Sequence, residues 1–221
     1  MGEAPKEDVD PERPGQSLVN SIRRRFEPLG GMDLPEIPRG PMREPPRFEA
    51  VIALRPTNLH WLEGVDERYD VCAHSSVEFC IDGSDLITKE AGDFTVSAAA
   101  LYLLRTLTRP HTKDGGPGQQ LFPCCGNGLF EGEDGDVVIV GCNSGVDFDI
   151  AHDGDEVIIT GADGREYFVG IAEWRAAVCR FSDLVQDSYA SSAPKEPGED
   201  APEFQQFMNE WRRRRSLAQP E

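Results

Sequence analysis

The chain has 221 residues, a length that suits one sizeable domain with tails or two small domains. Its 40 acidic and 22 basic residues give a net charge of −18. This balance disfavours nucleic-acid binding by the body of the protein, because phosphates are contacted mainly by Lys and Arg. The sequence has no apolar run long enough to span a membrane and does not begin like a secretory signal. We therefore expect a cytoplasmic protein whose six cysteines are thiols.

Prolines dominate the beginning of the chain, where nine of the 17 fall within residues 1–47. Each proline removes a backbone donor and disfavours helix at the residue before it. We therefore predict that residues 1–47 form an extended or disordered arm. One helical turn is expected at 17–26, where Leu18, Ile22 and Phe26 are spaced by four.

Three strands are predicted after the arm. Residues 48–55 form an apolar run that ends at Pro56. The sequence VEFCI at 77–81 alternates between the core and solvent, and Asp82-Gly83 then provides a hairpin turn into a return strand at 85–88.

Two core helices are predicted from their apolar stripes. Residues 94–109 are apolar over most of their circumference and are stopped by Pro110, as expected for a helix packed on a sheet. The second helix, residues 171–188, places Trp174, Val178, Phe181 and Val185 on one face.

Between these helices, residues 136–170 contain four short apolar runs separated by turns that hold Gly145, Gly154 and Gly164. We predict that the runs are four strands of an antiparallel meander. The fold class is therefore α+β, with an antiparallel β-meander sheet packed by two main helices in a domain of residues 48–190.

The end of the chain is expected to be a linker followed by a helix. Residues 191–202 are rich in Pro and charge, whereas residues 203–221 return to an amphipathic helical period with an Arg cluster at 212–215. The simplest prediction is a docked helix with a solvated basic end. The alternatives are a basic segment that folds back on the acidic body, or one that contacts nucleic acid or lipid.

The stretch LFPCCGNGLF raises the question of thiol chemistry. A catalytic thiol needs a histidine that activates it, and the alternative catalytic set is Cys124, Cys125, His74 and His111. Small Cys residues at a bend more commonly pack, and we expect at least one of the adjacent pair to be buried. No catalytic residue is assigned.

A metal site is the second kind of chemistry to consider. The cysteine spacing lacks the repeated close pairs of a structural zinc site. If the strand begins as early as Cys72, Cys72 and His74 project to the same side, so with His152 they form the alternative metal set. We assign no metal and no cofactor. No Walker A, Gly-x-Gly-x-x-Gly or Gly-x-Ser-x-Gly pattern occurs either.

Acidic side chains provide the predicted partner-binding set. The sequence EGEDGD at 131–136 lacks the terminal Glu of a calcium loop and is predicted to be an acidic hairpin tip. Other acids alternate with core residues on a later strand or follow it. The set comprises Glu131, Glu133, Asp134, Asp147, Asp149 and Asp153.

The ordered run WLEG…DVCAHSSVEFCIDG…TVSAAALYLLRTL…PCCGNGLF…VVIVGC…VDFDIAH resembles small uncharacterised bacterial proteins of the polymorphic-toxin immunity type, over about residues 60–190. The resemblance implies a cytoplasmic acidic protein that neutralises a basic toxin by direct binding. Charge also favours a basic protein partner, since complementary fields steer encounter. The alternatives are a thiol- or metal-dependent enzyme, or an assembly protein that uses its arms.

Overall fold

The computed structural model describes residues 20, 23–25, 27, 50–113, 119–124 and 128–218, apart from the side chain of Lys89. The chain divides into two units, residues 1–46 and 47–221. Of the first unit, residues 20 and 23–25 are helical. The rest of the predicted arm, including Leu18, Ile22 and Phe26, lies outside the described residues.

The first sheet has the order β1-β3-β4 and is antiparallel, with strands β1 (Ile52–Pro56), β3 (Val77–Ile81) and β4 (Ser84–Ile87). The predicted alternation in β3 is confirmed, because its apolar side chains are buried and the residues between them are partly exposed. Asp82 and Gly83 have φ of 51° and 77°, the left-handed pair that a tight hairpin needs. Pro56 is the last residue of β1, a tolerated position because β1 is an edge strand.

Helix α2 (Val96–Arg105) lies at the centre of the second unit and is buried along almost its whole length. It is shorter than the predicted 94–109. Phe94 and Thr95 instead form β5 (Phe94–Thr95), which pairs with β2 (His74–Ser75). At the other end the Thr106 hydroxyl donates to the Leu103 carbonyl, and the chain leaves the helix in a turn.

Two small strand pairs follow α2. Strand β6 (Phe122–Pro123) pairs with β9 (Gly145–Val146), and β7 (Gly128–Glu131) pairs with β8 (Val137–Val140). The turn of the second pair contains the short helix η3 (Glu133–Gly135). The predicted meander of four strands is therefore not formed. β8 belongs to a separate hairpin with β7, and β9 pairs with β6, which lies earlier in the chain.

The remaining strands form the sheet β10-β11-β12, which is antiparallel throughout. Its members are β10 (Asp149–Asp153), β11 (Glu156–Thr160) and β12 (Glu166–Gly170). Helix α3 (Ile171–Ser191) begins directly after β12, and all four residues of its predicted stripe are fully buried.

Helix α4 (Ala201–Leu217) packs on the body through Phe207 and Trp211, both buried. The segment before it, which the sequence predicts to be a linker, contains η4 (Gly198–Asp200) and contacts the body. The amide of Glu196 donates to the Arg68 carbonyl at 2.7 Å, and the Lys195 ammonium lies 3.1 Å from the ring centre of Trp61. The segment is thus fixed to the connection between β1 and β2.

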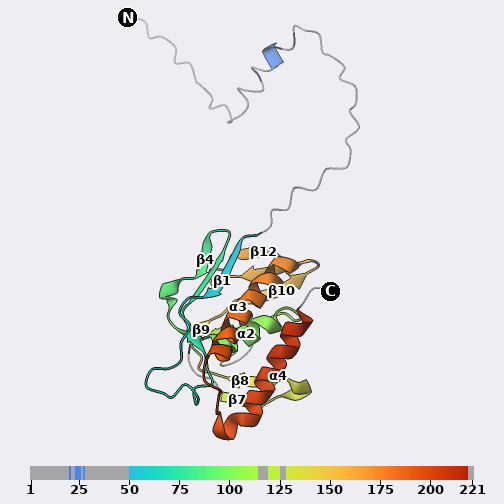
Figure 1. Ribbon diagram of the computed structural model, residues 1–221. Helices are drawn as coiled ribbons and strands as arrows, with labels where there is room; N and C mark the ends of the chain where they lie inside the picture. Colours follow the sequence, from blue (N-terminus) through green and yellow to red (C-terminus); the bar gives the residue numbers. More distant parts are fainter. Residues whose placement is uncertain are drawn as a thin grey trace, which may run out of the picture. The chain divides into compact units, whose positions relative to one another are not determined.

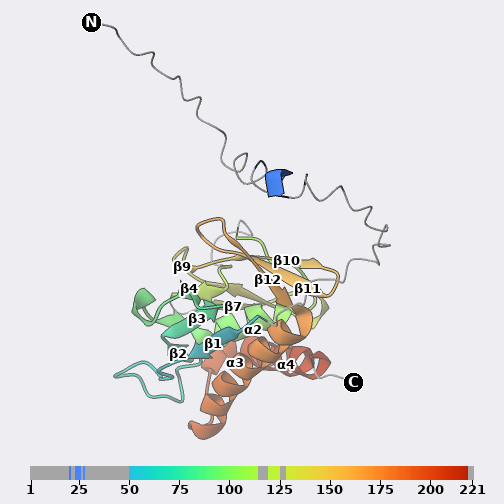
Figure 2. The same ribbon diagram turned by 90° about the horizontal axis from the view of Figure 1, so that it is seen from above.

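In the second unit, α3 and α4 lie along one side, the β10-β11-β12 sheet lies along the opposite side, and α2 runs between them (Figures 1 and 2). The predicted α+β class is confirmed. Among the described residues, no helix is both long and apolar enough to cross a membrane.

Candidate interaction face and the neighbouring cleft

The side of the β10-β11-β12 sheet that is turned away from the core carries an apolar row bordered by acids. Ala151, Ile158 and Phe168 are direct partners across the three strands. Ala151 is exposed, Ile158 is half-buried and Phe168 is 55% exposed. Side chains alternate along a strand, so the residues two positions before and after these three point to the same side of the sheet. They form one further row on each side of the apolar row. We call this surface the outer face of the sheet.

Acidic residues occupy the two rows that flank the apolar one. Asp149 and Glu166 each pair with Thr160, while Asp153 pairs with Glu156. Residues 149–170 contain six acids (these four with Asp155 and Asp163) and one cation, Arg165. Lys113 compensates Asp149, which it contacts at 3.4 Å. The outer face is therefore apolar in the middle and strongly acidic around it.

Two of the six predicted partner-binding acids, Asp149 and Asp153, lie on this face. Asp147 does not contribute, because its side chain is turned inward. One carboxylate oxygen of Asp147 is 2.8 Å from His111 Nε2 and accepts the backbone N–H groups of Leu121 and Phe148. Asp147 therefore has a structural role, since it joins three segments of chain. It lies outside β10, so the alternation of that strand, from which its exposure was predicted, does not apply to it.

The other three predicted acids, Glu131, Glu133 and Asp134, belong to the β7–β8 hairpin, which packs beside α4. All three are exposed. The outward side of this hairpin is also apolar, with Phe130, Val138 and Val140 exposed. The structure thus divides the predicted set between two hairpins.

Sequence reasoning did not identify the apolar row of the outer face. Its signal is present in both DEVIITG and REYFVG, where apolar residues occupy consecutive positions instead of alternate ones. Such runs are typical of strands with both faces covered. In this chain the inward residues, among them Val157, Ile159 and Val169, are fully buried, while the outward ones meet solvent.

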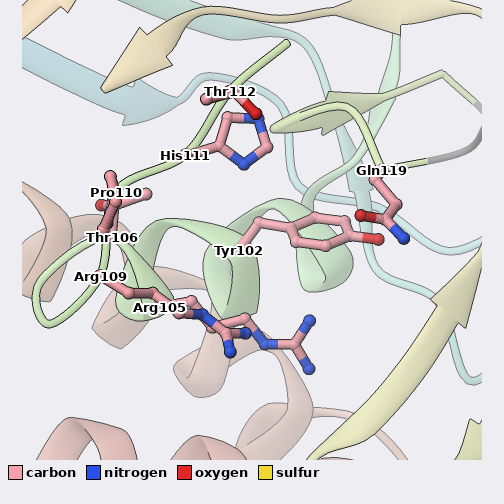
Figure 3. Close-up of a pocket in the computed structure, with 8 residues that line it drawn as sticks. All are labelled: Tyr102, Arg105, Thr106, Arg109, Pro110, His111, Thr112 and Gln119. Atoms are coloured by element: carbon pink, nitrogen blue, oxygen red, sulfur yellow. The ribbon is translucent and has the colours of Figure 1, made fainter. Parts of the chain in front are cut away.

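A cleft lies between the end of α2 and the β7–β8 hairpin. Figure 3 shows its narrower part, lined by Tyr102, Arg105, Arg109, His111 and Gln119 among others, with a volume of about 290 Å³. An adjoining hollow of about 800 Å³ shares four of these residues and is lined on its other side by the hairpin.

The polar groups of the cleft are largely occupied by one another. Arg105 donates two hydrogen bonds to the fully buried Glu210 and one to the carbonyl of Val137. The Tyr102 hydroxyl donates to the Ile139 carbonyl, and burial raises the pKa of Tyr102 to about 12. These bonds cap the outer edge of β8, which would otherwise present unpaired backbone groups.

Arg109 is the more open guanidinium of the cleft, about half exposed and 3.6 Å from Asp136. Burial lowers its pKa, and the charges of Arg105 and Arg214 lower it further. The two arginines that line the cleft each contact an acid, since Arg105 pairs with Glu210 and Arg109 with Asp136. We infer that its bonds serve mainly to hold α2, β8 and α4 together.

The alternative catalytic set is not assembled among the described residues. The sulfur of Cys124 lies 2.9 Å from that of Cys142, the ring of His111 is bonded to Asp147, and His74 is buried beside His60. Cys124 is half-buried, and Cys125 lies outside the described residues. Cys124 therefore does not meet the expectation that at least one of the adjacent pair is buried, and for Cys125 the expectation lies outside the described residues.

The alternative metal set is not assembled either. His152 Nε2 is bonded to the carbonyl of Thr106, whereas the buried Nε2 of His74 has no hydrogen-bond partner among the residues that the structure describes. Over the described part of the chain, no three His, Cys, Asp or Glu side chains converge as metal ligands would.

Comparisons of the chain with family models, with curated proteins and with solved structures give no match.

Proposed function

We propose that the protein is an acidic binding protein of the immunity or inhibitor type, which acts in the cytoplasm and neutralises a basic protein by direct association. The observation that carries the proposal is the outer face of the β10-β11-β12 sheet, an exposed apolar row with acids on both sides. An apolar centre with a polar border is the usual arrangement of a protein–protein interface.

Phe168 is the natural anchor of such an interface. It is the largest side chain of the apolar row and is 55% exposed, so a partner could bury its ring against Ile158. Large aromatic residues near the centre of an interface contribute a disproportionate part of the binding energy. Replacing one typically costs about 2 kcal/mol or more, which is roughly a 30-fold loss of affinity.

The charge around this row selects the partner. Acids surround Phe168, and Arg165 is the one cation in residues 149–170. A basic surface would find complementary charge at the border and an apolar contact at the centre. Toxins that attack nucleic acid need a basic surface for phosphates, and an acidic protein bound there would exclude the substrate. The resemblance to immunity proteins supports the same class.

The experiment is a retention assay, in which the immobilised protein captures binding proteins from native-host extract. Each variant of the outer face has a matched control variant on the β7–β8 hairpin. Phe168→Ser is matched by Phe130→Ser, because both side chains are 55% exposed. The charge reversal D153K/E166K is matched by E133K/D134K, which changes the net charge by the same amount. Mass spectrometry identifies the retained proteins, and titration with the purified protein gives Kd.

We expect a basic protein that is retained by the wild type and by both β7–β8 variants. Phe168→Ser and D153K/E166K should each weaken its binding by at least tenfold, and higher salt should weaken it further. Two outcomes would overturn the proposal. One is the absence of any basic protein that discriminates the variants; the other is loss of binding in the β7–β8 variants alone.

A further inference from the structure

Cys124 and Cys142 bring their sulfur atoms to within 2.9 Å of each other. A disulfide has an S–S bond of about 2.05 Å, so the two sulfurs need approach by only about 0.9 Å to become bonded. Two thiolates on one tetrahedral zinc, with Zn–S bonds of about 2.3 Å, would lie about 3.8 Å apart. The observed spacing is closer to the disulfide.

The backbone holds both cysteines in place. Cys124 follows β6, whose Phe122 is fully buried, and its amide donates to the Ser144 carbonyl at 3.2 Å. One residue separates Cys142 from the end of β8, and the Cys142 sulfur is 3.5 Å from the same carbonyl. Both cysteines therefore contact the carbonyl of Ser144, the residue that directly precedes β9.

Gly145 fixes the register that brings the cysteines together. Its φ is +148°, and a Cβ there would lie 2.5 Å from the carbonyl oxygen of Phe122, which no side chain could occupy. Only glycine lets the two backbones approach this closely. The pairing of Pro123 with Gly145, and with it the position of Cys124 opposite Ser144, is therefore set by the sequence.

We propose that Cys124 and Cys142 are a redox-active dithiol that hydrogen peroxide converts reversibly into an intramolecular disulfide. One thiolate attacks a peroxide oxygen, the O–O bond breaks, and that cysteine becomes a sulfenic acid while the other peroxide oxygen leaves as water. The second sulfur then attacks the sulfenic sulfur, the S–O bond breaks, and a second water leaves. Two thiols lose two electrons and two protons, and one peroxide becomes two waters.

The disulfide would have a structural consequence of its own. It would connect the end of β6 to the connection between β8 and β9 across 18 positions of the chain. Cys124 precedes β7 in the chain and Cys142 follows β8, so this link would join the two ends of the β7–β8 hairpin. The proposal does not depend on what the outer face of the β10-β11-β12 sheet binds.

The test treats the reduced full-length protein with stoichiometric hydrogen peroxide, quenches with an alkylating agent and maps the peptides without reduction. We expect titratable thiols to fall from six to four, with one cross-linked peptide joining Cys124 to Cys142 and full recovery with dithiothreitol. Cys124→Ser and Cys142→Ser should each abolish the cross-link. Cys125→Ser, the adjacent control, should leave it unchanged.

Three results would overturn the assignment. One is that all six thiols persist, or that cross-links spread to Cys72, Cys80 or Cys179. A second is that Cys125→Ser abolishes the link while Cys124→Ser preserves it. The third is that the reduced protein retains a metal ion which both Cys124→Ser and Cys142→Ser release. Peptide mapping of the wild type gives a result even if a serine variant fails to fold.

Discussion

Glu210 shows how one buried residue organises its surroundings. Its carboxylate is fully buried and accepts hydrogen bonds from Arg105, Arg214 and the amide of Val137. Burial alone would raise the pKa of Glu210. The bonds and charge of Arg105, with those of Val137 and Arg214, outweigh it and lower the pKa to about 2. One side chain thereby connects α2, β8 and α4.

The lowered pKa makes Glu210 a source of acid sensitivity. Its stabilisation is fully present above the carboxyl pKa of the unfolded chain, near 4.5, and is lost as pH falls towards 2. Between these limits the wild type should lose roughly 3 kcal/mol of unfolding free energy through this group. Glu210→Gln should be destabilised by about 3–5 kcal/mol at pH 7, because Arg105 is left buried without its charge partner. Urea unfolding at pH 7 and at pH 2 measures both, and an equal acid loss in the variant would contradict the assignment.

At the scale of elements, α4 is a structural part of the second unit and not a detachable tail. Trp211 is 1% exposed and packs edge-on against Phe207 at a centroid distance of 5.7 Å. The expected solvated basic end holds for Arg212 and Arg213, which are exposed, but not for Arg214 and Arg215, which are half-buried. Arg213 and Arg214 pair with Asp136, and Arg215 pairs with Asp183 on α3. The arginine run therefore fixes the helix to the body.

Trp211 provides the prediction for this element. Trp211→Ala should cost about 3–5 kcal/mol of unfolding free energy, because a large cavity replaces the indole. Trp211→Phe should cost clearly less, since the buried indole N–H finds no hydrogen-bond partner in the described part of the chain and its removal also removes an unsatisfied donor. Urea denaturation compares the two, and a cost for Trp211→Phe equal to that for Trp211→Ala would contradict this account.

Local patterns predicted the elements whose information is local. The stripe of α3, the alternation of β3 and the Asp82-Gly83 turn are all present in the structure, because spacing and turn chemistry determine them within a few residues. The partner of β8 was not predictable in this way. Its sequence VVIV is apolar on both faces and is therefore compatible with several pairing strands. Its pairing with β7 depends on tertiary packing.

The candidate sites follow the same division. Asp149 and Asp153 of the outer face were predicted from their places on or after a strand, whereas Glu156 and Glu166 were not part of the predicted set. Asp147 could not be separated from them, since its bonds reach His111 across 36 positions. The pairing of Arg105 with Glu210 spans 105 positions and has no local signal. A local sequence pattern does not determine which polar residues contact each other when they are far apart in the chain.

For the whole molecule, the distribution of charge matters more than its total. The net charge is −18, yet several arginines lie on the helical side, where they neutralise Glu210, Asp136 and Asp183. The opposite side is formed by the β10-β11-β12 sheet (Figure 2). This sheet keeps an excess of acids around its apolar row. This asymmetry would orient a basic partner before contact, since the field of the molecule steers approach.

The most direct test of this account is carboxyl footprinting of the protein alone and in complex with the basic protein that it retains. A carbodiimide couples an amine to each accessible carboxylate, and mass spectrometry gives the labelling of every acid. We predict that labelling of Asp153 and Glu166 falls severalfold in the complex, whereas that of Glu133 and Asp134 stays unchanged. Protection of Glu133 and Asp134 alone, or unchanged labelling at Asp153 and Glu166, would contradict the proposal that the outer face of the sheet binds the partner.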